Sequence, residues 1–310
     1  MKVIYGIENI NEKYDNLVVA LGTFDGIHLG HKKLIESAIK KADEINGTSM
    51  VFTFSPHPLE VLTSSSGPKL INSKEEKIQI LEDLGLDIIV FANFTVEFSE
   101  LHPEKFFKNI LKEMLDVKEL YVGFNYTFGK EGIGNTEYLK KLSKKYEMKI
   151  NVLPAVKINN EIVSSTLIRK EITQGNLEHI KEKLGYNYMV IGEVIHGKKL
   201  GRELGFPTAN LKLVNKVYPP YGVYGVKIKV EGETKKYWAI MNIGKNPTLK
   251  LNEHSLEVHI FNFDRDIYGE KIRIDLLEFI RIEKKFENKE KLISQIEKDI
   301  KNWKGSKKCH

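Results

Sequence analysis

The chain has 310 residues, of which 41% are hydrophobic and 29% are charged, a composition typical of a globular protein with about two domains. No apolar run approaches the ~20 residues that a membrane-spanning helix needs, and the first residues lack the apolar core of a signal peptide, so we expect neither. The formal net charge is +6, and the single cysteine, Cys309, excludes an internal disulfide framework and a cysteine-rich zinc site and fits a reducing cytoplasm.

The charge is spread unevenly along the chain. Residues 1–185 carry 24 basic and 26 acidic side chains, whereas residues 186–310 carry 24 and 16. A basic half fits an anionic small ligand or a nucleic acid, and lysines kept on the surface for solubility explain it equally well. We expect the lysine-rich run 301–308 to be a solvated tail.

The first part of the chain alternates strand-like and helix-like stretches, which predicts a parallel, doubly wound sheet with helices on both faces. The expected strands are 17–21, 49–54, 87–91, 119–123 and 150–154. The expected helices are 32–45, 74–84, 103–115 and 136–146. Ser73 and Glu76 have the spacing of a capping box at the start of the second of these helices. Ligands of such sheets bind at the carboxyl ends of the strands.

After about residue 185 the pattern changes to strands separated by Gly, Pro, Asn and Asp turns, which predicts an antiparallel barrel or sandwich. The expected strands are 190–195, 223–230, 236–243, 256–263 and 272–282. A final helix, 289–302, has apolar residues at helical spacing that we expect in the core. These are Leu292, Ile293, Ile296, Ile300 and Trp303. The expected junction is 175–188, which divides the chain into domains 1–183 and 184–310.

The densest motif of the first part runs from Gly22 to His31, between an expected strand and an expected helix. Its glycines let the backbone approach a ligand closely, and the start of the helix offers N–H groups and the positive end of the helix dipole. His28 and His31 can converge there, donate hydrogen bonds to a polyphosphate and stabilise charge that develops on it. The stretch therefore predicts a phosphate-binding loop.

Three further clusters follow expected strands. Pro56 and Pro58 surround His57 and predict a rigid loop. In the segment 123–130, aromatic side chains can sandwich a flat ring, and Asn125 can hydrogen-bond to the polar edge of that ring. The alternative is that Phe128 and its aromatic neighbours alternate into the core. In the segment 164–169, hydroxyls and an arginine can bind phosphate, whereas an N-capped helix with a surface arginine explains that segment when it is taken alone.

Together these clusters resemble the HxGH nucleotidyltransferases and, within them, the FAD synthetase family. The resemblance implies a Rossmann-like domain that transfers AMP from ATP to FMN and releases pyrophosphate, with His28 and His31 as catalytic residues and Arg169 assisting. It implies that ATP binds on Gly22, Thr23, Phe24, Asp25, His28, His31, Ser164, Ser165 and Arg169. It implies that the FMN isoalloxazine lies near Pro56, His57, Pro58, Asn125 and Phe128. The chain departs from the family at Glu131-Gly132-Ile133, where basic residues are common.

The second dense stretch runs from Gly201 to Leu211. Thr208 and Asn210 are two residues apart, so in an extended segment they face the same side. A hydroxyl and an amide oxygen are hard ligands that suit Mg²⁺ together with nucleotide phosphates and water. The glycines around Arg202 would let a loop close over phosphates, whereas the alternative is a plain Gly/Pro turn followed by a strand.

Glu257 lies within an alternating strand, where a carboxylate that faces a pocket could accept a proton from a substrate hydroxyl. Taken alone, it is more typical of a surface charge. With the glycine-bearing segments 221–225 and 241–248, the set resembles the riboflavin kinase family, whose fold is a small β-barrel. The resemblance implies Mg²⁺ on Thr208 and Asn210, and Glu257 as general base for the ribityl 5′-hydroxyl. It implies phosphate contacts from Gly201, Arg202 and Gly205.

The two resemblances cover nearly the whole chain, in the order found in the bacterial bifunctional riboflavin kinase/FMN adenylyltransferase family. They imply that riboflavin is phosphorylated to FMN and FMN is adenylylated to FAD, with ATP as co-substrate, Mg²⁺ as cofactor and the cytoplasm as location. The expected partners are these small molecules, without nucleic acid or membrane, and weak self-association stays open. Two alternatives remain: an adenylyltransferase whose barrel only binds flavin, and a nucleic-acid-binding or regulatory protein that uses the basic half.

Overall fold

A computed structural model describes residues 1–63, 67–197, 200–245 and 254–306. The chain divides into two compact units. The first consists of Met1–Leu70 and Lys77–Ser165, and the second of Ile71–Glu76 and Thr166–His310.

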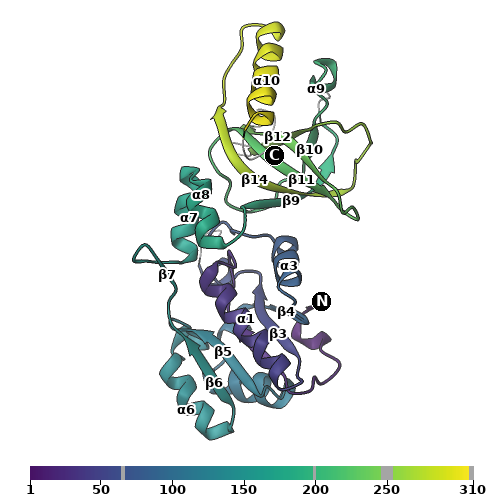
Figure 1. Ribbon diagram of the computed structural model, residues 1–310. Coiled ribbons are helices and arrows are strands. Elements are labelled where there is room, and N and C mark those ends of the chain that lie inside the picture. Colours follow the sequence, from purple (N-terminus) through teal and green to yellow (C-terminus); the bar gives the residue numbers. More distant parts are fainter. Residues whose placement is uncertain (64–66, 198–199, 246–253, 307–310) are drawn as a thin grey trace. The chain divides into compact units, whose positions relative to one another are not determined.

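The first unit is built on a six-stranded, wholly parallel sheet with the strand order β1-β4-β3-β2-β5-β6 (Figure 1). Its strands are β1 (Lys2–Tyr5), β2 (Val18–Leu21), β3 (Ser49–Ser55), β4 (Ile88–Asn93), β5 (Glu119–Gly123) and β6 (Lys149–Leu153). The doubly wound sheet predicted from the sequence is therefore confirmed. The four-residue β1 was not predicted, because Ile4 is its one buried residue and so short a stretch shows no periodicity.

The helices of the first unit are η1 (Ile7–Asn9), α1 (Leu29–Glu44), α2 (Pro58–Leu62), α3 (Lys74–Asp83, whose first three residues belong to the second unit), α4 (Val96–Ser99), α5 (Pro103–Lys105), η2 (Phe106–Met114), η3 (Lys130–Gly132) and α6 (Thr136–Tyr146). The four helices predicted in this unit are present with shifted ends, and its described residues form four further short helices, η1, α2, α4 and η3, that were not predicted. The stretch 103–115 is predicted as one α-helix, but after α5 it continues as the π-helix η2, in which Leu115 N–H donates to Ile110 O at 3.0 Å. The unit also holds the short hairpin of β7 (Lys157–Ile158) and β8 (Glu161–Ile162).

Helices cover both faces of this sheet because side chains alternate along each strand. Residues such as Val19 and Phe52 point toward η2 and α6, with which they form one buried cluster. Helix α1 contacts β2, β3 and β5, and it buries Leu34, Ile35 and Ala38. With both faces covered, the polar loops that end the strands are left to form a site at the edge of the sheet.

The second unit is a closed six-stranded antiparallel barrel, which settles the choice between barrel and sandwich (Figure 1). Its strands are β9 (Met189–Ile195), β10 (Ala209–Leu211), β11 (Gly222–Val230), β12 (Lys236–Lys245), β13 (His254–Ile260) and β14 (Lys271–Ile282), closed in the order β10-β13-β12-β11-β14-β9. The short helix α9 (Leu200–Glu203) precedes β10. The long helix α10 (Lys289–Lys304) lies against the outside of the barrel, where Trp303 packs with Val223 and Ile240.

Two helices lie before the barrel, α7 (Ser165–Gln174) and α8 (Leu177–Leu184). The stretch 175–188 is predicted as a junction, and α8 is not predicted. The stretch is nevertheless helical, because Leu177, Ile180 and Leu184 at helical spacing are buried, and Gly185 ends the helix with φ 75°.

A fully buried ion pair ties the segment Ile71–Glu76 into the second unit. Lys216 Nζ lies 2.6 and 2.8 Å from the two carboxylate oxygens of Glu76 and also donates to Met189 O at 2.7 Å. Glu76 completes the predicted capping box with Ser73 and accepts from Ile191 N–H at 3.0 Å. Both charged side chains have 0% exposure, so the pair is held by hydrogen bonds from several directions.

Candidate active sites

The strand order of the parallel sheet brings three predicted clusters to one edge. Strand β2 lies between β3 and β5, and the chain leaves β2 through α1 toward β3, so the gap between β2 and β5 is a topological switch point. The loops that begin at Gly22, Pro56 and Phe124 therefore start from neighbouring carboxyl ends. The fourth cluster joins them, because Ser165 Oγ donates to the carbonyl oxygen of Asp25 at 2.7 Å.

His28 is the N-cap of α1. Its Nδ1 accepts the backbone N–H of His31 at 3.3 Å, and only 7% of the residue is exposed. Burial lowers the pKa of His28 to about 4, so the imidazole is neutral near pH 7. Because Nδ1 accepts this bond, the proton of the neutral ring is on Nε2, which leaves Nε2–H as a donor toward a ligand.

His31 lies directly beside His28. The two rings stack with centroids 3.7 Å apart at an interplanar angle of 15°. The rings of Phe24 and His31 lie edge to face, with their centroids 5.3 Å apart. Burial, followed by the charges of His28 and Lys77, holds the pKa of His31 well below its usual value. Its Nδ1 is buried without a hydrogen-bond partner among the described residues. The predicted convergence of the two histidines is therefore present.

Gly30 makes room for this arrangement. A Cβ at Gly30 would lie 3.1 Å from Cε1 and 3.2 Å from Nδ1 of the His28 ring. Within the loop, Gly26 has φ 84°, and the non-glycine Phe24 has φ 45°, although it is only 1% exposed. The loop thus keeps an unfavourable backbone conformation, which is a feature of functional sites.

The residues expected near the flavin differ in exposure. His57 caps α2, since its Nδ1 accepts Leu59 N–H at 3.2 Å, and Asn125 is exposed. Phe128 is 7% exposed and packs in the core on Phe106 at 6.0 Å and Tyr126 at 5.7 Å. The alternative that these aromatics alternate into the core therefore holds for Phe128 and Tyr126.

Phe124 and Arg169, which belong to these clusters, are more exposed than Phe128. Phe124, between the glycine that ends β5 and Asn125, is 46% exposed. Arg169 lies on α7, one turn after Ser165, and is partly exposed. Phe124 is therefore exposed enough to contact a ligand.

In the barrel, the strand register places three polar side chains in one row. Asn210 on β10 is opposite Glu257 on β13, and Glu257 is opposite Asn242 on β12. Side chains of directly opposite residues share a face of the sheet, with Cβ atoms about 5 Å apart. Leu256 and Val258 are buried inside the barrel, so the row lies on its outer face. The sequence does not predict this pairing, which follows from the strand register of the barrel.

Two glycines support the residues expected to bind the metal. A Cβ at Gly197 would lie 2.1 Å from Nδ2 of Asn210, and a Cβ at Gly201 would lie 3.1 Å from Oγ1 of Thr208. The glycine-bearing loop therefore packs directly on Thr208 and Asn210. In the part of the chain that the structure describes, no group of three His, Cys, Asp or Glu residues could hold a metal ion. Thr208 and Asn210 supply uncharged oxygens, a donor set that fits Mg²⁺ bound together with phosphates and water.

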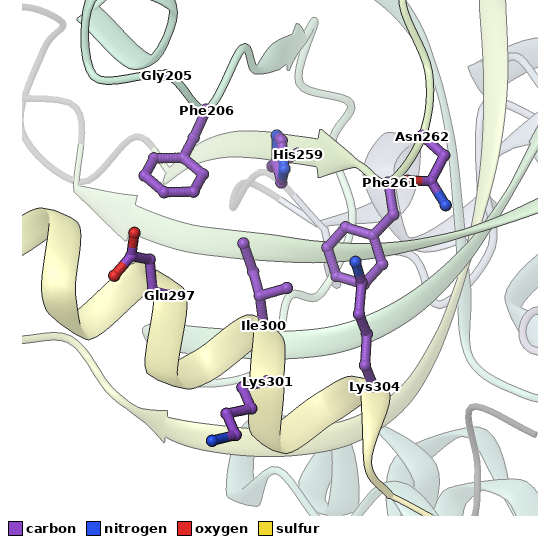
Figure 2. Close-up of a pocket in the computed structure, with 9 residues that line it drawn as sticks. All are labelled: Gly205, Phe206, His259, Phe261, Asn262, Glu297, Ile300, Lys301 and Lys304. Atoms are coloured by element: carbon purple, nitrogen blue, oxygen red, sulfur yellow. The ribbon is translucent and has the colours of Figure 1, made fainter.

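A cavity of about 500 Å³ lies between the loop after α9, the end of β13 and α10 (Figure 2). Its lining is Gly205, Phe206, His259, Phe261, Asn262, Glu297, Ile300, Lys301 and Lys304. Glu297, Ile300 and Lys304 project from α10 toward β13, and Lys304 Nζ lies 4.7 Å from the centre of the Phe261 ring (Figure 2). His259 Nδ1 is 2.9 Å from Pro207 O.

The sequence does not predict this cavity or the position of its lysines. Lys301 and Lys304 are exposed, as expected, but they belong to α10 and line the cavity, so the expectation of a tail is wrong for these two residues. A helix predicted to end at residue 302 gave no reason to place them beside Phe206, which is distant in sequence. Residues 246–248 of the segment 241–248, and Cys309, lie outside the described residues.

Two family models match the chain. The model described as FAD synthetase matches residues 10–167, and the model described as riboflavin kinase matches residues 184–306. The bifunctional riboflavin kinase/FMN adenylyltransferase of Listeria monocytogenes is 42% identical over 92% of this chain and 90% of its own length. The protein of the same name from Buchnera aphidicola of Schizaphis graminum is 39% identical over 97% of both chains.

A solved structure has the same fold over nearly the whole chain. It is a Streptococcus pneumoniae protein titled a macrolide-efflux protein, with a TM-score of 0.85 and 31% identity over 99% of this chain and 100% of its own. Among the described residues, no helix is long and apolar enough to cross a membrane.

Proposed function

Because the chain belongs to the bifunctional riboflavin kinase/FMN adenylyltransferase family, we propose which of its residues carry each of the two reactions. The enzyme phosphorylates riboflavin with ATP to FMN, and it adenylylates FMN with a second ATP to FAD and pyrophosphate. We place adenylyl transfer in residues 1–183 and phosphorylation in residues 184–310. The observation that carries this assignment is that each family match contains one of the two polar clusters, His28–His31 in the first and Asn210–Glu257 in the second.

In adenylyl transfer, an oxygen of the FMN phosphate attacks the α-phosphate of ATP, and the bond to pyrophosphate breaks. The FMN phosphate is already anionic, so the reaction needs positioning and charge stabilisation rather than a strong base. We assign the stabilisation of the α-phosphate and the departing pyrophosphate to His28 and His31, with Arg169 assisting. The low pKa of His28 supports a neutral imidazole that donates through Nε2–H.

The other residues of this site would bind the substrates. The loop from Gly22 to Asp25, with the hydroxyls of Ser164 and Ser165, would hold the phosphates of ATP. Pro56, His57, Pro58 and Asn125 would line the flavin site. Phe128, being in the core, would support that site from beneath, and the exposed Phe124 supplies an apolar surface beside Asn125.

In phosphorylation, Glu257 would accept the proton of the ribityl 5′-hydroxyl, whose oxygen attacks the γ-phosphate while ADP departs. Thr208 and Asn210 would hold Mg²⁺, which neutralises charge on the phosphoryl group during its transfer. Gly201, Arg202 and Gly205 would contact the phosphates. We assign the cavity beside Gly205 to the nucleotide, because Phe206 and Phe261 offer apolar walls to its base.

The remaining assignments follow from composition. We propose the reducing cytoplasm as the location, in keeping with the single cysteine. We propose only small-molecule partners, and weak self-association stays open. Salt-dependent RNA binding at near-physiological salt would instead support the alternative that the basic half binds nucleic acid.

The test is the substitution His28→Ala. We expect FAD formation from supplied FMN to be abolished, while FMN formation from riboflavin stays near the wild-type rate. His102→Ala is the matched control, because His102 also caps a helix, α5, through Nδ1, which accepts Glu104 N–H at 3.3 Å. Equal loss of both activities in a folded His28→Ala variant would contradict the two-site assignment.

A further inference from the structure

Lys77 is a buried cation beside the loop from Gly22 to His31, and the sequence motifs do not include it. It lies on α3 and is only 5% exposed. Its Nζ donates to the carbonyl oxygen of Thr23 at 2.9 Å, and its charge lowers the pKa of His31. Burying an ammonium group costs free energy, so the interactions of Lys77 with this loop must offset that cost.

The carbonyl oxygen of Thr23 accepts a second side-chain hydrogen bond. Thr53 on β3, with 0% exposure, donates its hydroxyl to the same oxygen at 3.0 Å. Two donors from different elements, α3 and β3, therefore fix the orientation of one peptide group. Few loop carbonyls need two dedicated side chains, since water satisfies an exposed one.

The direction of the Thr23 carbonyl determines the direction of the next N–H. The peptide bond between Thr23 and Phe24 is trans, because the cis bond of the described residues is Ser55–Pro56. In a trans peptide the carbonyl and the following N–H point to opposite sides. The hydrogen bonds from Lys77 and Thr53 therefore point Phe24 N–H away from these two side chains. Phe24 also has φ 45°, which is unfavourable for a residue with a side chain, and the fixed peptide helps to hold it there.

We propose that Lys77 is a positioning residue for adenylyl transfer: together with Thr53 it orients the Thr23–Phe24 peptide so that Phe24 N–H donates to a phosphate of ATP. The proposal rests on the assignment of this loop to the adenylyltransferase site. The ammonium group also adds positive charge beside a loop that receives a polyanion, which favours binding of the triphosphate. We assign the flavin to Pro56, His57, Pro58 and Asn125 rather than to this peptide, so FMN binding should not depend on Lys77.

The test uses the full-length enzyme and its two activities. Lys77→Met keeps the length of the side chain but removes the charge and the donor, and Thr53→Val keeps its shape but removes the hydroxyl. We expect kcat/KM for adenylylation of supplied FMN to fall about 100-fold in Lys77→Met and about 10-fold in Thr53→Val. The KM for ATP should rise, the KM for FMN should stay constant, and riboflavin phosphorylation should be unchanged. Lys74→Met, an exposed lysine of the same helix, is the control and should have wild-type values.

The double variant separates positioning from general stability. If both side chains act through one peptide, their losses overlap, so the double variant should be no more than slightly slower than Lys77→Met. Losses that multiply, or a Lys77→Met enzyme with the kinetics of Lys74→Met, would overturn the proposal. If Lys77→Met does not fold, Thr53→Val decides alone, and an unchanged KM for ATP overturns it. Full FAD synthesis by His28→Ala would instead refute the underlying site assignment.

Discussion

Asn210 and Glu257 face each other across β10 and β13 on the outer surface of the barrel. This pairing joins the expected metal ligand and the expected base, which are far apart in sequence. Asn242 extends the row on β12. The barrel therefore presents a carboxylate between two amides, an arrangement that can orient Glu257 and hold a cation beside it.

The first prediction concerns the base. Glu257→Gln keeps the shape of the side chain but cannot accept a proton, so we expect FMN formation from riboflavin to fall at least about 100-fold. Adenylylation of supplied FMN should continue at the wild-type rate. Steady-state assays of the two half-reactions measure both. Phosphorylation of riboflavin at the wild-type rate would show that Glu257 is not the base.

A second prediction concerns the glycine beneath Asn210. In Gly197→Ala the new methyl group would lie 2.1 Å from Nδ2 of Asn210, so the amide must move. We expect riboflavin phosphorylation to weaken and to need more Mg²⁺, with adenylylation unaffected. Gly305→Ala is the control, since the nearest atom to its Cβ would be at an ordinary 3.4 Å. An unchanged Mg²⁺ dependence in Gly197→Ala would argue against Asn210 as a metal ligand.

A third prediction concerns the dependence of stability on pH. The pKa of His28 is about 4 in the folded protein, below the ordinary value of 6.5, so between these values the unfolded chain binds a proton that the folded one does not. The contribution of the neutral, buried His28 to the free energy of unfolding is therefore fully present above pH 6.5. As the pH falls from 6.5 toward 4, the free energy of unfolding decreases by at most about 3 kcal/mol.

Amide hydrogen exchange of α1 at pH 7 and pH 5 measures this loss. His28→Asn keeps an N-cap but does not titrate, so its exchange should show a smaller loss of protection between the two pH values, after correction for the intrinsic rates. The same loss in wild type and variant would mean that His28 is not held neutral by burial.

Most of the fold could be predicted from residue patterns, and the exceptions have physical causes. Strands such as β3 and helices such as α1 are long enough to show periodicity, whereas β1 is too short. The pattern of η2 fits an α-helix, and nothing local distinguishes the π-helix that forms there.

The candidate sites were predictable where sequence neighbours act together, as His28 and His31 do. Register and packing set the rest: the row that includes Asn242 depends on strand pairing, and Lys77 reaches Thr23 only because α3 packs beside the loop. The cavity beside Phe206 likewise requires α10 to lie against the barrel.

A fourth prediction concerns the buried ion pair. Lys216→Met leaves the Glu76 carboxylate buried without its cation, which should destabilise the second unit by about 3–5 kcal/mol. Both tryptophans, Trp238 and Trp303, lie in that unit, so the tryptophan fluorescence during denaturant unfolding reports on it.

Two further variants make this measurement specific. Lys212→Met, at an exposed lysine of the same segment, should change the unfolding free energy by no more than about 0.5 kcal/mol. Glu76→Gln combined with Lys216→Met removes both charges and should recover part of the loss. A Lys216→Met protein as stable as Lys212→Met would show that the pair contributes nothing.

Whether two separate sites act in series is best measured by incubating riboflavin, ATP and Mg²⁺ with the wild-type enzyme, with each variant and with a mixture of the two variants, followed by chromatography of the flavins. We predict that the wild-type enzyme forms FMN and FAD and that His28→Ala accumulates FMN. Glu257→Gln should convert riboflavin at least about 100-fold more slowly, and the mixture of the two variants should form FAD. A mixture that forms no FAD from two folded variants, or a His28→Ala enzyme that makes neither product, would contradict the action of two separate sites.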